Sequence, residues 1–181
     1  RIFGIPLYDT TTEYRQALES ESQAYTSSID LDVIRGLDCL PVVEKYNLEK
    51  KTIIDLMVFA YLPLIQIQRM DIANLLSYRA LRLSESVGIT DSSPSAFVHF
   101  AAYLSKKKNY CRIAFELGET AISVNKRLNA GRFKSKLLFM HAVQLYHFGS
   151  PVRGSVDLFQ KAYACGVETG DLVEAGFCTA N

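Results

Sequence analysis

The sequence of 181 residues has no tryptophan, only five prolines and ten glycines, and no Cys-x-x-Cys pair. So few turn-forming residues argue against an all-β fold, in which many short strands are joined by tight turns. The four cysteines stand singly among apolar neighbours, so we expect reduced thiols in the core of a cytoplasmic protein. These residues are Cys39, Cys111, Cys165 and Cys178.

The sequence also lacks an excess of one charge and any long apolar run. Lys and Arg number 20 and Asp and Glu number 19, giving a net charge of +1. This balance argues against a protein that binds nucleic acid or a membrane surface through a basic patch. The longest apolar run, residues 56–65, is far shorter than the roughly 20 residues that span a bilayer. With 49% hydrophobic residues, we expect a folded cytoplasmic protein with no membrane insertion and no nucleic-acid partner. The chain begins with Arg1 rather than Met, so we expect a piece of a longer protein.

The usual motifs of nucleotide, metal and nucleophilic chemistry are missing. Residues 149–154 have the glycine spacing of a phosphate loop, but Ser155 and Val156 replace the required Lys-Ser/Thr. No histidine lies in His-Glu-x-x-His, and no serine lies in Gly-x-Ser-x-Gly. We therefore predict no catalytic residue, no metal and no cofactor in this chain.

Helical patterns begin near the amino terminus. Thr10 and Glu13 form a Thr-x-x-Glu capping box, which predicts a helix through about residue 25. A short helix is predicted over 31–40, where Pro41 ends it. Residues 1–45 are thus an N-terminal lead-in with one or two helices. Asn47 can cap the next helix, for which we predict a buried stripe of Ile53, Leu56, Phe59, Ala60 and Leu64.

From residue 46 to residue 181 the apolar pattern repeats with a period of about 41 residues. The pattern has the three- and four-residue spacing of one helix face, with a small residue between larger ones. The matching sets are Leu76, Ala80, Leu83 and Val87; Leu117, Ala121, Val124 and Leu128; and Leu158, Ala162, Cys165 and Thr169. The same shift relates Ala60, Ala101 and Ala142, and also Leu56, Phe97 and Leu138. We predict that the helix contacts bury Leu76, Ala80, Leu117, Ala121, Leu158 and Ala162.

Turn-forming residues fall where this period requires helix ends. Gly88, Asn129 and Gly170 each follow a predicted helix, where a left-handed residue closes the last turn. Ser93-Pro94 and Ser150-Pro151 suit helix starts, because the first helical position needs no N–H donor. We predict antiparallel pairs of 53–67 with 71–87, 94–108 with 110–128, and 133–148 with 151–169, and a further helix from Asp171 that is cut at Asn181. The predicted fold is an all-α solenoid of helix pairs, similar to tetratricopeptide repeats.

The stretch from Val167 to Ala175 resembles the end of a tetratricopeptide-like region in very large signalling proteins. In that family this helical region follows a protein-kinase-like and an AAA-type ATPase-like domain, and precedes a GAF domain, a histidine kinase and often a receiver. Cyanobacterial and fungal hybrid sensor kinases are of this type. The resemblance covers about residues 45–178, and includes Glu49 to Met57, Ala60 to Pro63, Leu83 to Gly88, and Ser93 to Tyr103.

The sequence departs from this family and its repeats in three ways. The period is 41 residues in place of 34, tryptophan is absent, and no histidine has the His-Glu-x-x context of the family's phosphoacceptor. No phosphoacceptor role therefore transfers to His99, His141 or His147. The resemblance implies a noncatalytic scaffold or regulatory segment of a cytoplasmic sensor histidine kinase, which contacts other domains of the same chain or a signalling protein.

Two other functions remain open from the sequence. One is a small-molecule sensor with a pocket between helices, lined by Tyr103, His141 and Tyr146; the other is a helical fragment of another enzyme. For the scaffold, the predicted contact surface is a ridge formed by the first helices of successive pairs, because aromatic residues anchor interfaces well. The alternative that these side chains pack against the second helices is equally open. The ridge residues are Tyr61, His99, Tyr103, His141 and Tyr146.

Overall fold

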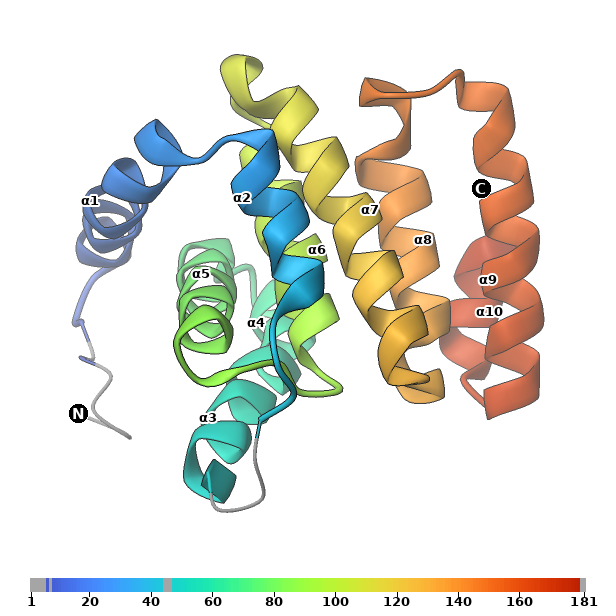
Figure 1. The fold of residues 1–181 in the computed structure, drawn as a ribbon, viewed down its shortest axis with the longest axis horizontal. Coiled ribbons are helices and arrows are strands. Elements are labelled where there is room, and N and C mark those ends of the chain that lie inside the picture. Colours follow the sequence, from blue (N-terminus) through green and yellow to red (C-terminus); the bar gives the residue numbers. More distant parts are fainter. Residues whose placement is uncertain (1–5, 7, 44–46, 180–181) are drawn as a thin grey trace.

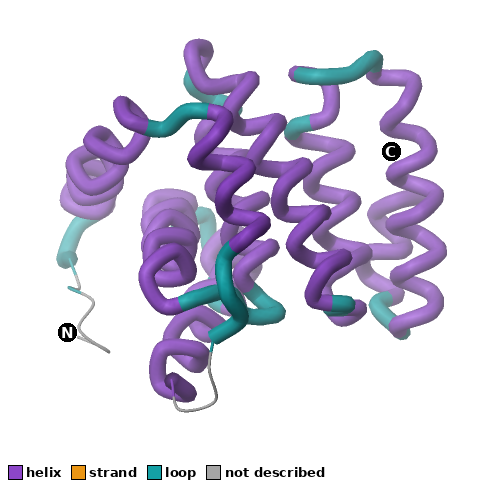
Figure 2. Tube along the Cα trace, viewed as in Figure 1, coloured by secondary structure: helices purple, strands orange, loops and turns teal. Residues whose placement is uncertain are grey.

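The protein is all-helical in the residues that the structure describes, which are residue 6 and residues 8–43 and 47–179 (Figures 1 and 2). This computed structural model has no strand in those residues, only an isolated parallel bridge between Val42 and Ile89. The predicted all-α class is therefore confirmed. The helices are α1 (Thr11–Ser28), α2 (Leu31–Gly36), α3 (Leu48–Phe59), α4 (Tyr61–Gln66), α5 (Met70–Val87), α6 (Ser93–Leu104), α7 (Cys111–Leu128), α8 (Lys134–Gln144), α9 (Ser155–Thr169) and α10 (Leu172–Thr179).

Local sequence signals explain where several helices begin and break. The capping box of α1 is present, with Thr10 Oγ1 accepting from Glu13 N at 3.2 Å and Glu13 Oε2 accepting from Thr10 N at 2.9 Å. The predicted helix over 53–67 is two helices, because Pro63 cannot donate to the carbonyl of Phe59, and α3 ends there. Helix α9 begins at Ser155 rather than at 151, since Val152–Gly154 form a 3₁₀ turn.

The 41-residue spacing of the sequence is also the spacing of helix boundaries. Helices α5, α7 and α9 end at Val87, Leu128 and Thr169, each 41 residues after the last. The residue after each end has a positive φ, 105° at Gly88, 51° at Asn129 and 77° at Gly170. Asn129 and Gly170 are left-handed as predicted, whereas Gly88 has an extended ψ of 169°. The three helix stops were thus correctly located from residue type.

Neighbouring helices in the chain pack on one another from α5 to α10, and they form a layered stack (Figure 1). Helix α6 packs against both α5 and α7, α8 packs against α6, α7 and α9, and α10 packs against α9 and α8. Helix α1 packs on α5, and α2 packs on α7. Consequently α1 lies at one end of the molecule and α9 and α10 lie at the other (Figure 1).

The small residues of the repeat lie at the helix contacts, as predicted. Ala80, Leu117, Ala121 and Ala162 are fully buried. Leu76 and Leu158 were also predicted to be buried, but they are only partly buried at the edge of the core. Alanine allows helix backbones to approach closely, and the larger residues one turn away fill the space at the side.

The stripe predicted on α3 and α4 is largely wrong. Ile53 is buried, but Leu56 and Phe59 are exposed, and Ala60 and Leu64 are partly buried. Leu56 and Phe59 lie on α3 with Ile53, so within that helix the stripe followed the wrong face, and after Phe59 it crossed the break into α4. The buried face of α3 instead comprises Ile53, Ile54, Met57 and Val58.

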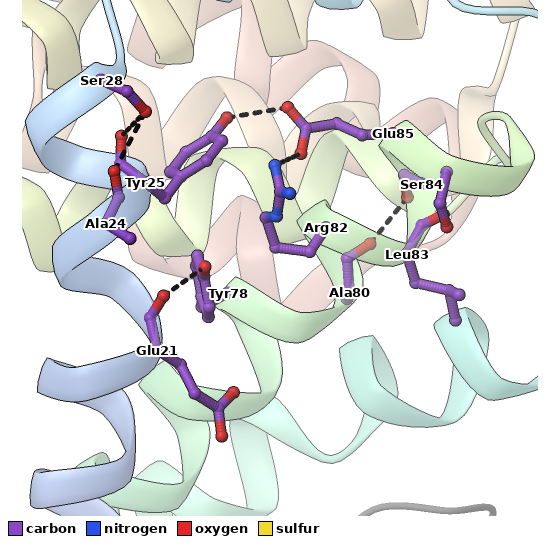
Figure 3. A network of polar contacts seen from close by, with 11 residues as sticks. Glu21, Ala24, Tyr25, Ser28, Tyr78, Ala80, Arg82, Leu83, Ser84 and Glu85 are labelled. Atoms are coloured by element: carbon purple, nitrogen blue, oxygen red, sulfur yellow. Dashed lines mark hydrogen bonds and ion pairs between the residues drawn. The ribbon is translucent and has the colours of Figure 1, made fainter.

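Polar contacts fix α1 to α5 (Figure 3). The Tyr25 hydroxyl donates to Glu85 Oε1 at 2.9 Å, and Arg82 Nη1 donates to Glu85 Oε2 at 2.5 Å. The Tyr78 hydroxyl donates to the carbonyl oxygen of Glu21 at 2.6 Å. Burial raises the pKa of Glu85, and Tyr25 and Arg82 oppose this by stabilising its carboxylate. These contacts cover one face of α5 with the N-terminal segment.

The segment after α2 lies along α7. Ser123 Oγ donates to Asp38 Oδ2 at 2.7 Å, and Arg127 Nη2 donates to the Leu40 carbonyl at 3.0 Å. The chain then pairs with residue 89, where Ile89 N donates to the Pro41 carbonyl at 2.8 Å. A Cβ on Gly88 would lie 2.7 Å from that same carbonyl oxygen, so both the crossing and the positive φ require glycine. Helix α7 is therefore covered by the N-terminal segment, as α5 is.

Two of the four cysteines lie in the core as predicted, and two do not. All four are free thiols, and Cys165 and Cys178 are buried as predicted. Cys111 is partly buried, and Cys39 is exposed because it lies in the 3₁₀ turn that follows α2.

Candidate functional site

The five aromatic and histidine residues predicted to form an exposed ridge are mostly inside the protein. Tyr61 is 4% exposed, and His99 and His141 are 0% exposed, so the prediction of an exposed surface is wrong for these three. Tyr103 and Tyr146 are partly buried. The reason is clearest at α6, where eleven of the twelve residues are buried. A helix without a charged face is typically buried on all sides. The stretch from Ser93 to Leu104 contains no charged residue, so the burial of this helix could have been predicted from the sequence.

The structure brings four of the five residues together in two pairs rather than placing all five in one row. The rings of Tyr61 and His99 are stacked, with centroids 3.5 Å apart and planes inclined by 6°. The rings of His141 and Tyr146 lie 6.0 Å apart in an edge-on arrangement. Tyr103 contacts Phe100 and Lys107 instead. None of Tyr103, His141 and Tyr146 lines the pockets described below, so the predicted pocket of these three residues does not coincide with them.

His99 is a neutral packing residue. Neither of its ring nitrogens has a hydrogen-bond partner. Burial lowers the pKa of His99 well below its ordinary value, and the positive charge of Lys136 lowers it further. The imidazole is therefore uncharged near neutral pH and packs as a flat ring against Tyr61.

His141 links α8 to α7 at a close crossing. Its Nε2 lies 2.7 Å from Glu119 Oε1, but the two groups are not oriented for a hydrogen bond. A Cβ on Gly118 would lie 2.4 Å from His141 Nδ1, so the side chain occupies the space that glycine leaves. This arrangement explains a buried histidine by helix packing alone.

A pocket of about 520 Å³ with a charged lining, which we call the junction pocket, includes Lys136, the residue whose charge acts on His99. It lies where the end of α3 and the start of α4 meet the first turn of α8 and the turn from α9 to α10. Its lining residues come from three separate parts of the chain. They are Phe59, Leu62, Arg132, Phe133, Lys136, Thr169, Gly170, Asp171, Val173 and Glu174.

The junction pocket contains charged groups that are poorly solvated. Glu174 is 7% exposed, and burial raises the pKa of its carboxyl group, although the charge of Lys136 acts in the opposite direction. Burial lowers the pKa of the Lys136 amine, and the charges of Glu174 and Asp171 oppose this. Arg132 lies over two rings, 4.9 Å from the centroid of Phe59 and 5.3 Å from that of Phe133. Ionisable side chains that line a pocket, and whose charged form burial disfavours, are typical of binding sites.

A second pocket, of about 630 Å³, lies between α1, α3 and α5. Lys50, Arg79 and Arg82 line it together with Glu21. Arg79 already forms an ion pair with Glu21, and Arg82 forms one with Glu85. The guanidinium groups of this pocket therefore already have partners within the protein, and the pocket is a gap between packed helices rather than a candidate site.

The most apolar surface lies on α9 and α10. Among the residues that the structure describes, seven of the fourteen exposed large hydrophobic side chains fall within residues 152–179. Six of the seven, which are 45–69% exposed, define what we call the α9–α10 face. They are Val156, Tyr163, Val167, Leu172, Val173 and Phe177.

The 41-residue register relates this face to surfaces that are covered elsewhere. Val156 and Tyr163 of α9 correspond to Phe115 and Ile122 of α7, which are partly buried. The ring of Phe115 lies 5.6 Å from that of His141 on α8. Ile122 packs against the cluster that contains Leu138 and Ala162. The same face of α7 is thus used to stack the next helix pair, whereas on α9 it is exposed.

Within the described residues, no group of three or more His, Cys, Asp and Glu side chains is placed to hold a metal ion. Across the same part of the chain, no helix has both the length and the apolar character needed to cross a membrane. Comparisons of the chain with protein-family models, with curated proteins and with solved structures found no match.

Proposed function

We propose that this chain is a noncatalytic helical-repeat scaffold whose α9–α10 face contacts another protein segment. The observation that carries the proposal is the exposed apolar face at one end of a stack with a regular register. Solenoid repeats require a polar outer face on their terminal units if these are to remain exposed. The α9–α10 face instead has apolar side chains, and exposed apolar side chains gathered on two neighbouring helices are typical of a contact site.

The finer part of the proposal is that the stack is a tetratricopeptide-like solenoid within a cytoplasmic sensor or hybrid histidine kinase. It is supported by the resemblance of residues 167–175, whereas the 41-residue register supports only a regular array of helices. In this context the scaffold positions neighbouring domains, because each helix pair packs rigidly on the next. The scaffold itself is expected neither to bind nucleotide nor to hydrolyse ATP.

Site-specific photo-crosslinking tests the contact surface. A photoreactive residue at Tyr163, which is 45% exposed, is compared in cells with one at Val33, which is 42% exposed and lies on α2. We expect a discrete protein crosslink from position 163 and none from position 33. Equal crosslinking from both positions would refute the proposed surface. A crosslinked segment without any kinase, GAF or receiver domain in its chain would refute the signalling context. ATP hydrolysis that copurifies with the protein and survives rigorous purification would refute a noncatalytic scaffold.

A further inference from the structure

The junction pocket is lined by ionisable groups that the protein pairs only in part. The Lys136 amine lies 6.0 Å from the centroid of the Tyr61 ring. Glu174 is 7% exposed and lines the pocket, and among the described residues no hydrogen bond to its carboxyl group is found. Lys136 lines the same pocket and attracts Glu174 electrostatically, but the two side chains form no close ion pair. A buried charged group without a partner costs free energy, and a ligand that supplies the partner recovers that cost.

The charges around the pocket are balanced, and this restricts the chemistry of the ligand. Arg132 and Lys136 supply two positive charges, and Asp171 and Glu174 supply two negative charges. Asp171 Oδ1 accepts from Glu174 N at 3.4 Å and caps α10, so Glu174 is the acid with the greater need of a partner. A simple anion or cation would be attracted by one pair of groups and repelled by the other. A small zwitterion is complementary to both pairs.

The remaining wall of the pocket is apolar. It consists of Phe59, Leu62, Phe133 and Val173, and the first two of these are 43% and 40% exposed. Burying such side chains under an apolar group is favourable in proportion to the area covered. The volume of about 520 Å³ is within the range of small-molecule sites. The pocket therefore combines a place for two opposite charges with a place for an apolar group.

We propose that the junction pocket binds a free α-amino acid with an apolar side chain, with its carboxylate at Lys136 and its ammonium group at Glu174. The side chain of the ligand lies against the phenyl and aliphatic wall, and Arg132 at the edge of the pocket adds to the attraction for the carboxylate. This binding site goes beyond the scaffold function and does not depend on it.

Four related compounds test which groups of the ligand are recognised. Leucine is compared by calorimetry with leucinamide and isoamylamine, which lack the carboxylate, and with isocaproate, which lacks the ammonium group. We expect leucine to bind with a Kd of about 1 mM or tighter, and each analogue to bind at least about tenfold more weakly. Aspartate, which lacks the apolar group, should bind weakly as well.

Two variants assign the recognition to residues. Lys136→Met should abolish the advantage of leucine over isoamylamine, and Glu174→Gln should abolish the advantage of leucine over isocaproate. Lys161→Met and Glu168→Gln change exposed residues of α9 outside this pocket and should leave all affinities unchanged. Each pocket variant removes a poorly solvated charge, so we expect a native circular dichroism spectrum. If either variant fails to fold, the analogue series on the unchanged protein still decides.

Three results would overturn the proposal. The first is the absence of leucine binding tighter than about 1 mM. The second is equal binding of leucine and leucinamide, which would indicate a site for a peptide amino terminus. The third is equal binding of leucine and isocaproate, which would indicate a simple anion site.

Discussion

The close contact between α7 and α8 at Gly118 makes a sharp prediction about stability. A Cβ at this position would lie 2.4 Å from His141 Nδ1 and 2.7 Å from Leu145 Cδ1. Both neighbouring side chains are fully buried, so neither can turn into solvent to relieve the contact. Gly118→Ala should therefore force the two helices apart or drive His141 out of its packed position. Gly176→Ala in α10 is the matched control, because a Cβ there would meet no atom within 4 Å.

The magnitudes follow from two opposing effects. Replacing a helical glycine by alanine stabilises a helix by about 1 kcal/mol, mainly by restricting the unfolded chain. Overpacking a closed core site costs about 1–3 kcal/mol. Gly176→Ala should therefore be stabilising, and Gly118→Ala should range from neutral to destabilised by about 2 kcal/mol. The difference between the two variants, about 1–3 kcal/mol, isolates the cost of the contact.

Urea unfolding followed by circular dichroism measures both variants on the same scale. In thermal unfolding, the same difference in the free energy of unfolding should separate the Tm values of the two variants by a few degrees, at about 2–4 °C for each kcal/mol in a chain of this size. A His141→Ala background removes the contact with His141 and leaves the one with Leu145. Gly118→Ala should therefore be less destabilising relative to that background than it is in the unchanged protein. Equal stabilisation by Gly118→Ala and Gly176→Ala in the otherwise unchanged protein would refute the close crossing.

Two further predictions concern other buried positions. Ala121 is fully buried at the centre of α7. Ala121→Leu should lower the free energy of unfolding by about 1–3 kcal/mol in the same urea assay, because the larger side chain overpacks the helix contact. An unchanged value would mean that the 41-residue repeat register is wrong. His99 has a lowered pKa in the folded state, so below about pH 6.5 the unfolded chain binds a proton that the folded protein does not. The free energy of unfolding should therefore fall on acidification below that pH, by up to about 1.4 kcal/mol per pH unit. His99→Phe removes the titrating group, so the free energy of unfolding of this variant should depend less on pH. Urea titrations between pH 6.5 and 4.5 measure both proteins. Identical slopes in the two proteins would show that His99 is not buried in its neutral form.

Helix ends were predictable because they depend on the residue at the end itself. Gly88, Asn129 and Gly170 adopt positive φ at low cost, and each follows a helix in the structure. The start of α1 was predictable for the same reason, since Thr10 and Glu13 satisfy each other's backbone groups. Such signals need no knowledge of what packs nearby.

The direction of individual side chains was less predictable. An aromatic residue on a helix suits either a core or an interface, and only the neighbouring helices decide between them. Tyr61 and His99 were expected on a ridge, but their helices are covered by neighbours and the two rings stack inside. The junction pocket could not be predicted at all, because Phe59 and Glu174 are brought together only by the tertiary fold.

Helix α10 is the element on which both proposals meet. It has eight residues, too few for an isolated helix to be stable in water, so its position depends on its contacts with α8 and α9. Its first turn places Glu174 in the junction pocket, and Leu172 and Phe177 contribute to the α9–α10 face. A ligand that pairs with Glu174 would stabilise α10 in place, and a segment packed on α10 would stabilise the burial of Glu174. Coupling of this kind is reciprocal by thermodynamic necessity, so a ligand that strengthens the protein contact must itself bind more tightly when that contact is formed.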